Sequence, residues 1–288
     1  MGIALTAGMR NNLIALQGVD KMMQTTQNRL STGKRVNSAL DDPVNFFKAE
    51  DHYNRASDLA AKKDGMGEAI KIIETANTGI ENIESLLNQM KSLAAAAKTS
   101  GNPGDLEDQY NVLIDQVGAM AEDANYGGQN LLKMTATAGD NDLSVEFNED
   151  SGTAANTLTV SGFDITVDTT TPDAPTVTLT SGTAGPAIAA ADFTDNTSIE
   201  AAITEIDAFI SQLRTEAQKL SSNLSTIQIR SDFTNAMVNT LNTGADNLTL
   251  ADMNEEGANM LMLQTRQNLG TTSLSLASQA AQSVLRLF

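Results

Sequence analysis

The sequence predicts a mainly α-helical fold with a small β-rich insert, in which the N- and C-terminal segments form a long, antiparallel, coiled-coil-like helical bundle. Apolar residues recur in heptads toward both ends of the chain, which is the pattern of helices that pack on one another. The middle of the chain is instead rich in Thr, Ser, Gly, Asp and β-branched residues. Aromatic residues make up only 4% of the chain and Trp is absent, so we expect thin seams between helices.

The first expected helix begins near Met9. Its apolar residues follow at spacings that average near 3.5, and they are Leu13, Leu16, Val19, Met23 and Leu30. A break is expected at residues 31–34, and Pro43 supplies a second stop because proline disfavours helix at the residue before it. Since proline is also welcome in a first helical turn, a new helix is expected just after it.

An antiparallel helical hairpin is expected next. Ten consecutive heptad positions are apolar between Met66 and Ala97, and the pattern returns between Leu106 and Ala124. The turn residues 100–104, Ser-Gly-Asn-Pro-Gly, separate the two segments. Tyr126-Gly127-Gly128 is expected to end the hairpin.

A β-rich insert is expected between about residues 134 and 196. Candidate strands lie at Leu143–Phe147, Leu158–Val167 and Thr176–Thr180. No Lys or Arg occurs from Met134 to Leu213, so the surface of the insert is acidic and solvated. We expect it to face outward from any assembly.

Heptads resume between Ile199 and Ile227, and a break is expected at Gly244. The last segment keeps a heptad grid from Met260 to Phe288, with Gln267 and Gly270 at its two weak positions. Because the insert lies between helical halves, both termini return to the same end of the molecule. The expected domains are discontinuous: a terminal coiled-coil domain of residues 1–42 and 245–288, a helical bundle domain of residues 43–135 and 197–244, and a variable β-rich domain of residues 136–196.

Composition excludes several classes of function. The formal net charge is −18, from 36 acidic and 18 basic residues, which disfavours nucleic acid and anionic membrane surfaces as partners. The absence of Cys excludes disulfides, zinc–thiolate sites and thiol nucleophiles. No stretch approaches the roughly 18 apolar residues of a membrane span. The N-terminus lacks the features of a cleavable secretory signal, so we expect a cytoplasmic protein or one that is exported whole.

Neither a metal site, a cofactor nor catalysis is expected. His52 lies beside acidic residues, but a single His without an HExxH pattern favours a solvated histidine. The insert holds no Trp, His, Lys or Arg from which a polar catalytic pocket could be built. A calcium site is the less favoured alternative for a cluster of carboxylates that lacks EF-hand spacing: Asp140, Asp142, Glu146, Glu149 and Asp150.

Residues 29–43, Arg-Leu-Ser-Thr-Gly-Lys-Arg-Val-Asn-Ser-Ala-Leu-Asp-Asp-Pro, resemble the N-terminal signature of bacterial flagellins. Residues 124–132 resemble the turn that follows the first helical hairpin of that family. The C-terminus is similar to the flagellin tail at residues 258–264, 277–280 and 284–288. Together the matching stretches cover roughly residues 1–133 and 197–288.

The resemblance implies a structural subunit that polymerises into the extracellular bacterial flagellar filament for motility, after unfolded export by the flagellar type III apparatus. Its implied partners are copies of itself in a helical homopolymer, the filament cap and hook-junction proteins, and an export chaperone that binds the C-terminal helix. The terminal domain would line the inner tube, and the insert would lie outside. The alternative is a hook–filament junction protein of the same family, which serves as an adaptor.

An open helical filament requires that one surface of a subunit meets a different surface of its neighbour. The terminal helices are the candidates, because their apolar seam is poorly covered by one chain. We expect self-assembly contacts from Leu13, Leu16, Met23, Leu274, Ala281, Val284 and Phe288. The alternative, that part of this set packs only within one chain, stays open.

Many flagellins carry a site on the first hairpin that an animal Toll-like innate receptor recognises through an Arg and a following Glu. In the matching stretch of this chain, Gln89 and Ser92 stand where those two residues are expected, on either side of Lys91. The substitutions remove a bidentate donor and its acidic neighbour, so weak receptor activation is expected. Residues 153–183 are rich in Ser and Thr that could accept O-linked glycans, but composition names no position.

Overall fold

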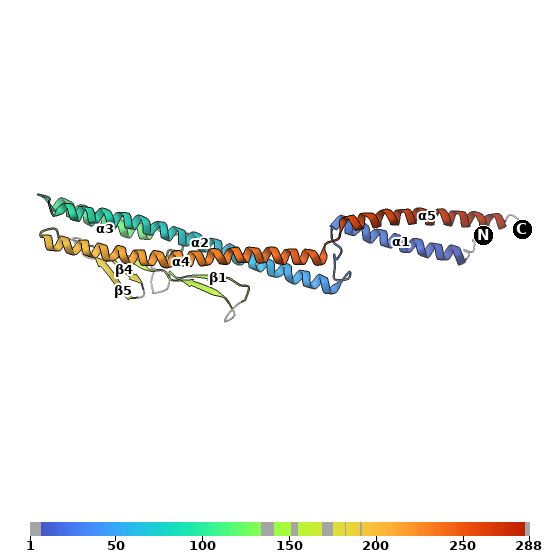
Figure 1. Ribbon diagram of the computed structural model, residues 1–288, viewed down its shortest axis with the longest axis horizontal. Helices are drawn as coiled ribbons and strands as arrows, with labels where there is room; N and C mark the ends of the chain where they lie inside the picture. Colours follow the sequence, from blue (N-terminus) through green and yellow to red (C-terminus); the bar gives the residue numbers. More distant parts are fainter. Residues whose placement is uncertain are drawn as a thin grey trace. The chain divides into compact units, whose positions relative to one another are not determined.

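The computed structural model describes residues 7–133, 141–150, 155–168, 175–181, 183–190 and 192–285, without the side chains of residues 183, 184, 281, 284 and 285. Five helices and five strands occur in these described residues (Figure 1). The chain divides into two compact units. Unit 1 comprises Met1–Ala56 with Asn239–Phe288, and unit 2 comprises Ser57–Val238.

Unit 1 is built on a pair of helices from the two ends of the chain. Helix α1 (Ala7–Thr32) packs against helix α5 (Met253–Leu285), and the first turns of α1 lie toward the end of α5 (Figure 1). The pairing is antiparallel, because the Asn12 amide donates to Ser273 Oγ whereas Asp20, further along α1, accepts from Gln267. The expected packing of the N-terminal helix on the C-terminal helix is confirmed.

Unit 2 contains most of the long helices α2 (Pro43–Ala97) and α4 (Asn196–Thr249), which pack antiparallel. Three ion pairs link them, and their α4 numbers fall as their α2 numbers rise: Glu84–Arg214, Lys91–Asp207 and Lys98–Glu200. The heptad prediction for α2 is confirmed, because all ten of its apolar positions are buried. They are Met66, Ala69, Ile73, Ala76, Ile80, Ile83, Leu87, Met90, Ala94 and Ala97.

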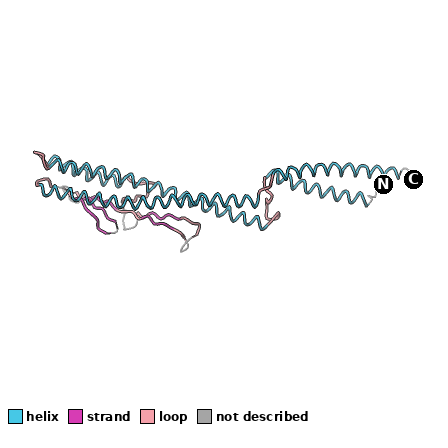
Figure 2. The backbone as a smooth tube through the Cα atoms, viewed as in Figure 1, coloured by secondary structure: helices cyan, strands magenta, loops and turns pink. Residues whose placement is uncertain are grey.

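Helix α3 (Gly104–Asp123) completes the expected hairpin with α2 (Figure 2). The amide of Asn102 donates to Asp105 at 2.7 Å and fixes the turn before it. After α3 the backbone takes positive φ at Gly127 and Gly128, 61° and 91°, which side chains other than glycine rarely allow. The expected end of the hairpin at these glycines is therefore confirmed.

The insert forms two small antiparallel sheets. Strand β1 (Leu143–Glu146) pairs with β2 (Thr157–Val160), with Val145 opposite Leu158. The second sheet has the order β3–β4–β5, with strands that run Asp164–Asp168, Thr176–Ser181 and Thr183–Ile188.

Two strand predictions differ from the structure. The single strand expected over residues 158–167 is two strands in different sheets, because Gly162 N donates to Asp142 and Phe163 N donates to Leu131 O between them. Strand β5 was not expected, since it contains a glycine and a proline. Gly185 is required there, because a Cβ would lie 2.1 Å from Leu179 O.

The insert is bonded to the segment that follows α3 and packs against α3. The N–H of Ile165 donates to Leu132 O at 2.9 Å, and the buried amide of Asn141 donates to Phe163 O at 3.0 Å. Strand β3 also lies so close to α3 that a Cβ on Gly118 would meet Val167 Cγ2 at 2.1 Å. Close packing therefore holds β3 on α3, and a backbone hydrogen bond ties β3 to the segment that follows α3.

The expected helix break at Gly244 is wrong, because α4 continues through it to Thr249. A glycine inside a helix costs only about 1 kcal/mol relative to alanine, and packing readily offsets that amount. The actual break is at residues 250–252. Asp252 Oδ1 accepts from Asn254 N at 2.8 Å and caps the start of α5.

Candidate assembly surface

The seam between α1 and α5 buries few side chains. Among the described residues of the two helices, the buried ones are Met9, Thr26, Glu256 and Leu263. The helices approach closely at Gly270, where an added Cβ would lie 2.7 Å from Leu16 Cδ2. The two weak positions of the last heptad grid are thereby explained, because Gly270 receives Leu16 and Gln267 donates to Asp20 at 2.8 Å.

One ion pair fixes the register of this seam. Arg29 Nη1 donates to Glu256 Oε1 at 2.9 Å, and the side chain of Glu256 is only 8% exposed. A buried carboxylate without a partner is strongly unfavourable, so the guanidinium is needed wherever Glu256 is buried. The pair joins the last turn of α1 to the first turns of α5.

Backbone hydrogen bonds connect the segment that follows α1 to the segment that precedes α5. Gly33 has a φ of 70°, and its carbonyl accepts from Ala251 N at 3.0 Å. The carbonyl of Thr249 accepts from Arg35 N at 2.7 Å and from Val36 N at 3.2 Å, and Val36 is buried. We call residues 33–42 and 249–252 the joint of unit 1.

Two carboxylates order the rest of the joint. Asp41 accepts from the N–H groups of Asn37 and Ser38, and these bonds lower the pKa of its carboxyl. Asp42 accepts from the N–H of Asn45 and so caps α2, which lowers its pKa as well. The motif at residues 29–43 therefore encodes a helix end, a tight turn and a helix cap.

The residues expected to mediate self-assembly fall into three groups. Leu13 is 40% exposed, whereas Leu16, Met23 and Leu274 are half-buried in unit 1. Ala281 and Val284 lie on α5, but their side chains are outside the described part of the chain, as is the whole of Phe288. Leu16 packs against α5 within the same chain, so at least this member has an internal contact.

The most exposed apolar side chains of the helix pair were not among those predicted. On α1, Ile14 is 65% exposed and Met22 is 47% exposed. On α5, beyond Met253 in its first turn, four side chains with exposures of 44–68% form what we call the α5 stripe: Leu261, Met262, Leu269 and Leu276. Three of these follow one another at intervals of seven residues, so they share one face of the helix. A second set of apolar residues at intervals of seven, Met262, Leu269 and Leu276, is the sequence signal that could have identified them.

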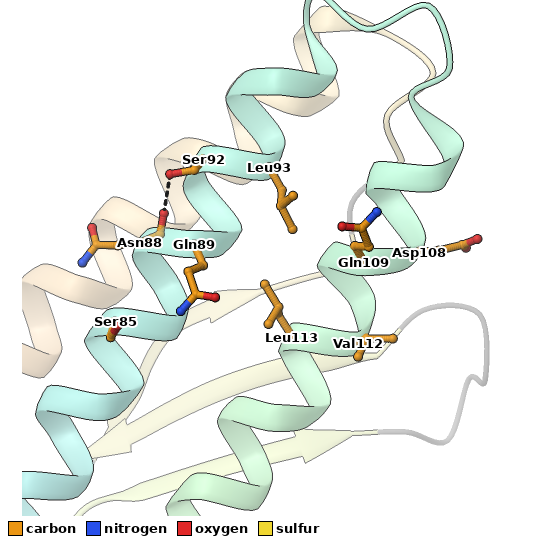
Figure 3. A pocket seen from close by; sticks show the side chains of 9 residues that line it. All are labelled: Ser85, Asn88, Gln89, Ser92, Leu93, Asp108, Gln109, Val112 and Leu113. Carbon is orange, nitrogen blue, oxygen red and sulfur yellow. Dashed lines mark hydrogen bonds between the residues drawn. The ribbon is translucent and has the colours of Figure 1, made fainter.

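The residues of the expected receptor site do not all lie together. Gln89 and Ser92 line a groove of about 780 Å³ between α2 and α3, into which Leu93 and Leu113 project (Figure 3). Lys91 instead pairs with Asp207 on α4. Ser92 Oγ donates to its own helix at Asn88 O, 2.9 Å away, so it is partly engaged.

Two carboxylates of the acidic cluster in the insert make contacts with nitrogen donors. Gly162 N donates to Asp142, and Glu146 pairs with Lys62, so these carboxylates serve structural contacts. Asp140 lies outside the described residues. Within the described part of the chain, no group of three or more His, Asp or Glu side chains is placed to hold a metal ion. None of the described helices has the length and apolarity needed to cross a bilayer.

Comparison with known families gives two matches that flank the insert. Residues 6–137 match the bacterial flagellin N-terminal helical region, and residues 197–288 match the bacterial flagellin C-terminal helical region.

Individual relatives match along almost the whole chain. A flagellin of Brucella melitensis is 30% identical over 287 residues, which cover 99% of this chain and 96% of that protein. Flagellin FljK of Caulobacter vibrioides is 30% identical over 295 residues, with coverage of 99% and 98%. A crystal structure of Bacillus cereus flagellin aligns with a TM-score of 0.43 and 21% identity, over 59% of this chain and 88% of that one.

Proposed function

Because the chain belongs to the bacterial flagellin family, we propose that it polymerises through unit 1, with the exposed apolar side chains of α1 and α5 packing between copies. It is a structural subunit of the flagellar filament, which is extracellular and self-assembling, and it is not an enzyme. What remains to be assigned is the surface that joins one copy to the next.

The observation that carries this proposal is the exposure of large apolar side chains on α1 and α5, outside the seam where the two helices pack together. Leu261, Leu269 and Leu276 are each at least 61% exposed, although they belong to a helix that already buries Leu263 against α1. Full burial of a leucine stabilises by about 1.5–3 kcal/mol relative to exposure. Within unit 1 these leucines stay exposed. Their burial against a neighbouring copy would supply this stabilisation.

The contact must be heterologous for an open polymer to form. A self-complementary patch would close into a dimer, whereas different surfaces in contact continue into a helical filament. The α5 stripe and the exposed α1 residues, Leu13, Ile14 and Met22, are two distinct surfaces of unit 1. We therefore assign one to each side of the contact, with Val284 and Phe288 extending the α5 side.

The remaining parts of the filament arrangement are assigned from the family. Residues 1–42 with 245–288 line the inner tube, residues 43–135 with 197–244 form the next layer, and residues 136–196 lie outermost. The chain is exported unfolded, its C-terminal helix binds the export chaperone, and it meets the cap and hook-junction proteins at the filament ends. The Ser- and Thr-rich insert is a candidate for O-linked glycans.

Seeded growth followed by electron microscopy tests the assembly proposal. The full chain and a chain without residues 284–288 are added to the same short filament seeds. Long filaments from the full chain alone support assembly through the terminal helices. If the full chain binds seeds without elongating them, the adaptor role is favoured, and growth by both chains removes the last five residues from the contact.

A weak response of the Toll-like receptor is proposed separately, on the strength of Gln89 and Ser92 in the α2–α3 groove. The amide of Gln89 cannot form the bidentate hydrogen bonds of a guanidinium, and the hydroxyl of Ser92 carries no negative charge. Purified monomer should signal weakly in a reporter cell, and a Gln89→Arg, Ser92→Glu variant should signal more strongly. Strong signalling by the unchanged chain would contradict the proposal.

A further inference from the structure

Methionine is the side chain of this protein that a mild oxidant attacks most readily. The chain contains 12 Met residues and no Cys, so no thiol competes with the thioethers for the oxidant. Oxidation of a thioether gives a sulfoxide, which turns a flexible apolar side chain into a polar one. The effect on the protein therefore depends on which methionines are open to solvent and on the surfaces to which they belong.

The exposed methionines lie in unit 1. Ten of the 12 are in the described residues, and among these ten only Met22, Met253 and Met262 are exposed, at 44–48%. The described methionines of unit 2 are buried or half-buried, and Met66 and Met90 are fully buried. An oxidant in solution should therefore react first with side chains of unit 1.

Two of the three exposed methionines lie on the surfaces assigned to the contact between copies. Met22 is on the α1 surface, and Met262 belongs to the α5 stripe, seven residues before Leu269. Met253 is in the first turn of α5, outside the stripe. A thioether suits an apolar contact because methionine fills irregular gaps. A sulfoxide does not, because its oxygen requires a hydrogen-bond donor once it is buried, and leucine side chains provide none.

We propose that Met22 and Met262 are sites of reversible oxidation, at which a peroxide switches self-assembly off and a sulfoxide reductase switches it on again. This inference rests on the proposed assembly through unit 1. In the forward step the sulfur takes one oxygen atom from hydrogen peroxide as the O–O bond breaks, and the other oxygen leaves as water. In the reverse step a methionine sulfoxide reductase releases the oxygen as water while a dithiol is oxidised to a disulfide. Joined copies cover both side chains, so oxidation acts on free copies.

The test compares seeded growth before and after treatment of the monomer with hydrogen peroxide. Treatment continues until peptide mass spectrometry finds sulfoxide at Met22 and Met262 while Met66 and Met90 stay unmodified, and the peroxide is then removed. We expect the critical concentration for growth to rise about tenfold or more. Incubation with the two sulfoxide reductases, one for each epimer, and dithiothreitol should reverse the rise.

Paired variants assign the effect to the two sites. The variant Met22→Leu, Met262→Leu has no sulfur at either site, whereas the matched control Met253→Leu loses one exposed sulfur outside the stripe. Each variant is compared with its own untreated sample, because Met22 and Met262 belong to the contact. After peroxide the critical concentration of the double variant should stay the same, and that of the control should rise as in the unchanged chain.

A second readout needs no variant. The same peroxide treatment is applied to filaments and to monomer of the unchanged chain, and sulfoxide is measured at each site by mass spectrometry. Met22 and Met262 should be oxidised more slowly in filaments, because neighbouring copies cover them. Equal rates in the two samples would overturn the inference.

The outcomes separate this inference from the proposed function. If the untreated chain does not elongate seeds, the proposed assembly itself fails. If the untreated and oxidised chains grow at the same critical concentration, the inference is overturned and self-assembly stands. An equal rise in the double variant also overturns it, because other methionines would then be responsible. Circular dichroism of the oxidised monomer should show unchanged helix content, and a loss of helix would overturn the inference by placing the damage in the fold.

Discussion

Replacing Gly118 with Ala tests how closely the insert is packed on α3. A Cβ at this position would lie 2.1 Å from Val167 Cγ2 and 3.1 Å from Val167 Cβ, so α3 or β3 would have to shift. Overpacking of this kind costs about 1–3 kcal/mol. Alanine also gains roughly 1 kcal/mol over glycine in a helix interior, so the net loss of stability should be about 0–2 kcal/mol.

Gly67 supplies the matched control for this substitution. It also lies inside a helix, α2, but no atom comes within 4 Å of an added Cβ. Gly67→Ala should therefore stabilise by about 0.5–1 kcal/mol, and the two variants should differ by about 1–3 kcal/mol. The free energy of unfolding is measured by denaturant titration of the monomer, followed by circular dichroism.

A second comparison assigns the effect to one contact. In a Val167→Ala background the γ-methyl groups are gone, so Gly118→Ala should cost less than it does in the unchanged chain. If Gly118→Ala stabilises as much as Gly67→Ala, or if Val167→Ala makes no difference, the close packing of β3 on α3 is refuted.

Three further predictions concern unit 1. Tyr53→Phe removes a hydroxyl that donates to Asp246 at 2.6 Å and should cost about 1 kcal/mol, measured as faster amide hydrogen exchange at the end of α4. Gly270→Ala should raise the critical concentration for filament growth, because its Cβ would meet Leu16 at 2.7 Å, and Leu16→Ala should relieve part of that increase. Acid should loosen the joint: hydrogen bonds from the backbone hold the folded-state pKa of Asp42 below 3.8, so its contribution is complete above that pH and is lost as the pH falls through the lowered value. Protection factors for hydrogen exchange at the start of α2 that stay the same from neutral pH to a pH well below the lowered pKa of Asp42 would contradict this last prediction.

The long helix α2 could be predicted from the sequence because burial follows the heptad pattern at all ten of its apolar positions. Met66, Leu87 and Ala97 all lie on the predicted grid and all are buried. The error at Gly244 has a physical cause, since a local cost of about 1 kcal/mol is small against the packing of a 54-residue helix. Local residue preference alone therefore placed that helix end in the wrong position.

The strands of the insert were harder to predict, because long-range bonds define them. The break between β2 and β3 depends on a bond from Phe163 N to Leu131 O, far along the chain. Strand β5 contains a glycine that the close carbonyl of Leu179 requires, and this requirement is invisible in composition.

The candidate assembly surface could be predicted only in part. The heptad grid identifies residues that pack against something, but it does not separate packing within a chain from packing between chains. Leu16 lies on that grid and contacts α5 of its own chain, whereas the more exposed Leu269 and Leu276 lie off it. Exposure in the folded unit was needed to make that distinction.

The most direct test of the account is seeded filament growth by a Leu269→Asn, Leu276→Asn variant, counted by electron microscopy beside the unchanged chain. These side chains are 66% and 61% exposed in unit 1, so burial between copies would add roughly 1–2 kcal/mol for each. The account predicts long filaments from the unchanged chain and a critical concentration at least about 30-fold higher for the variant. Filaments of the same length at the same critical concentration from both chains would contradict it.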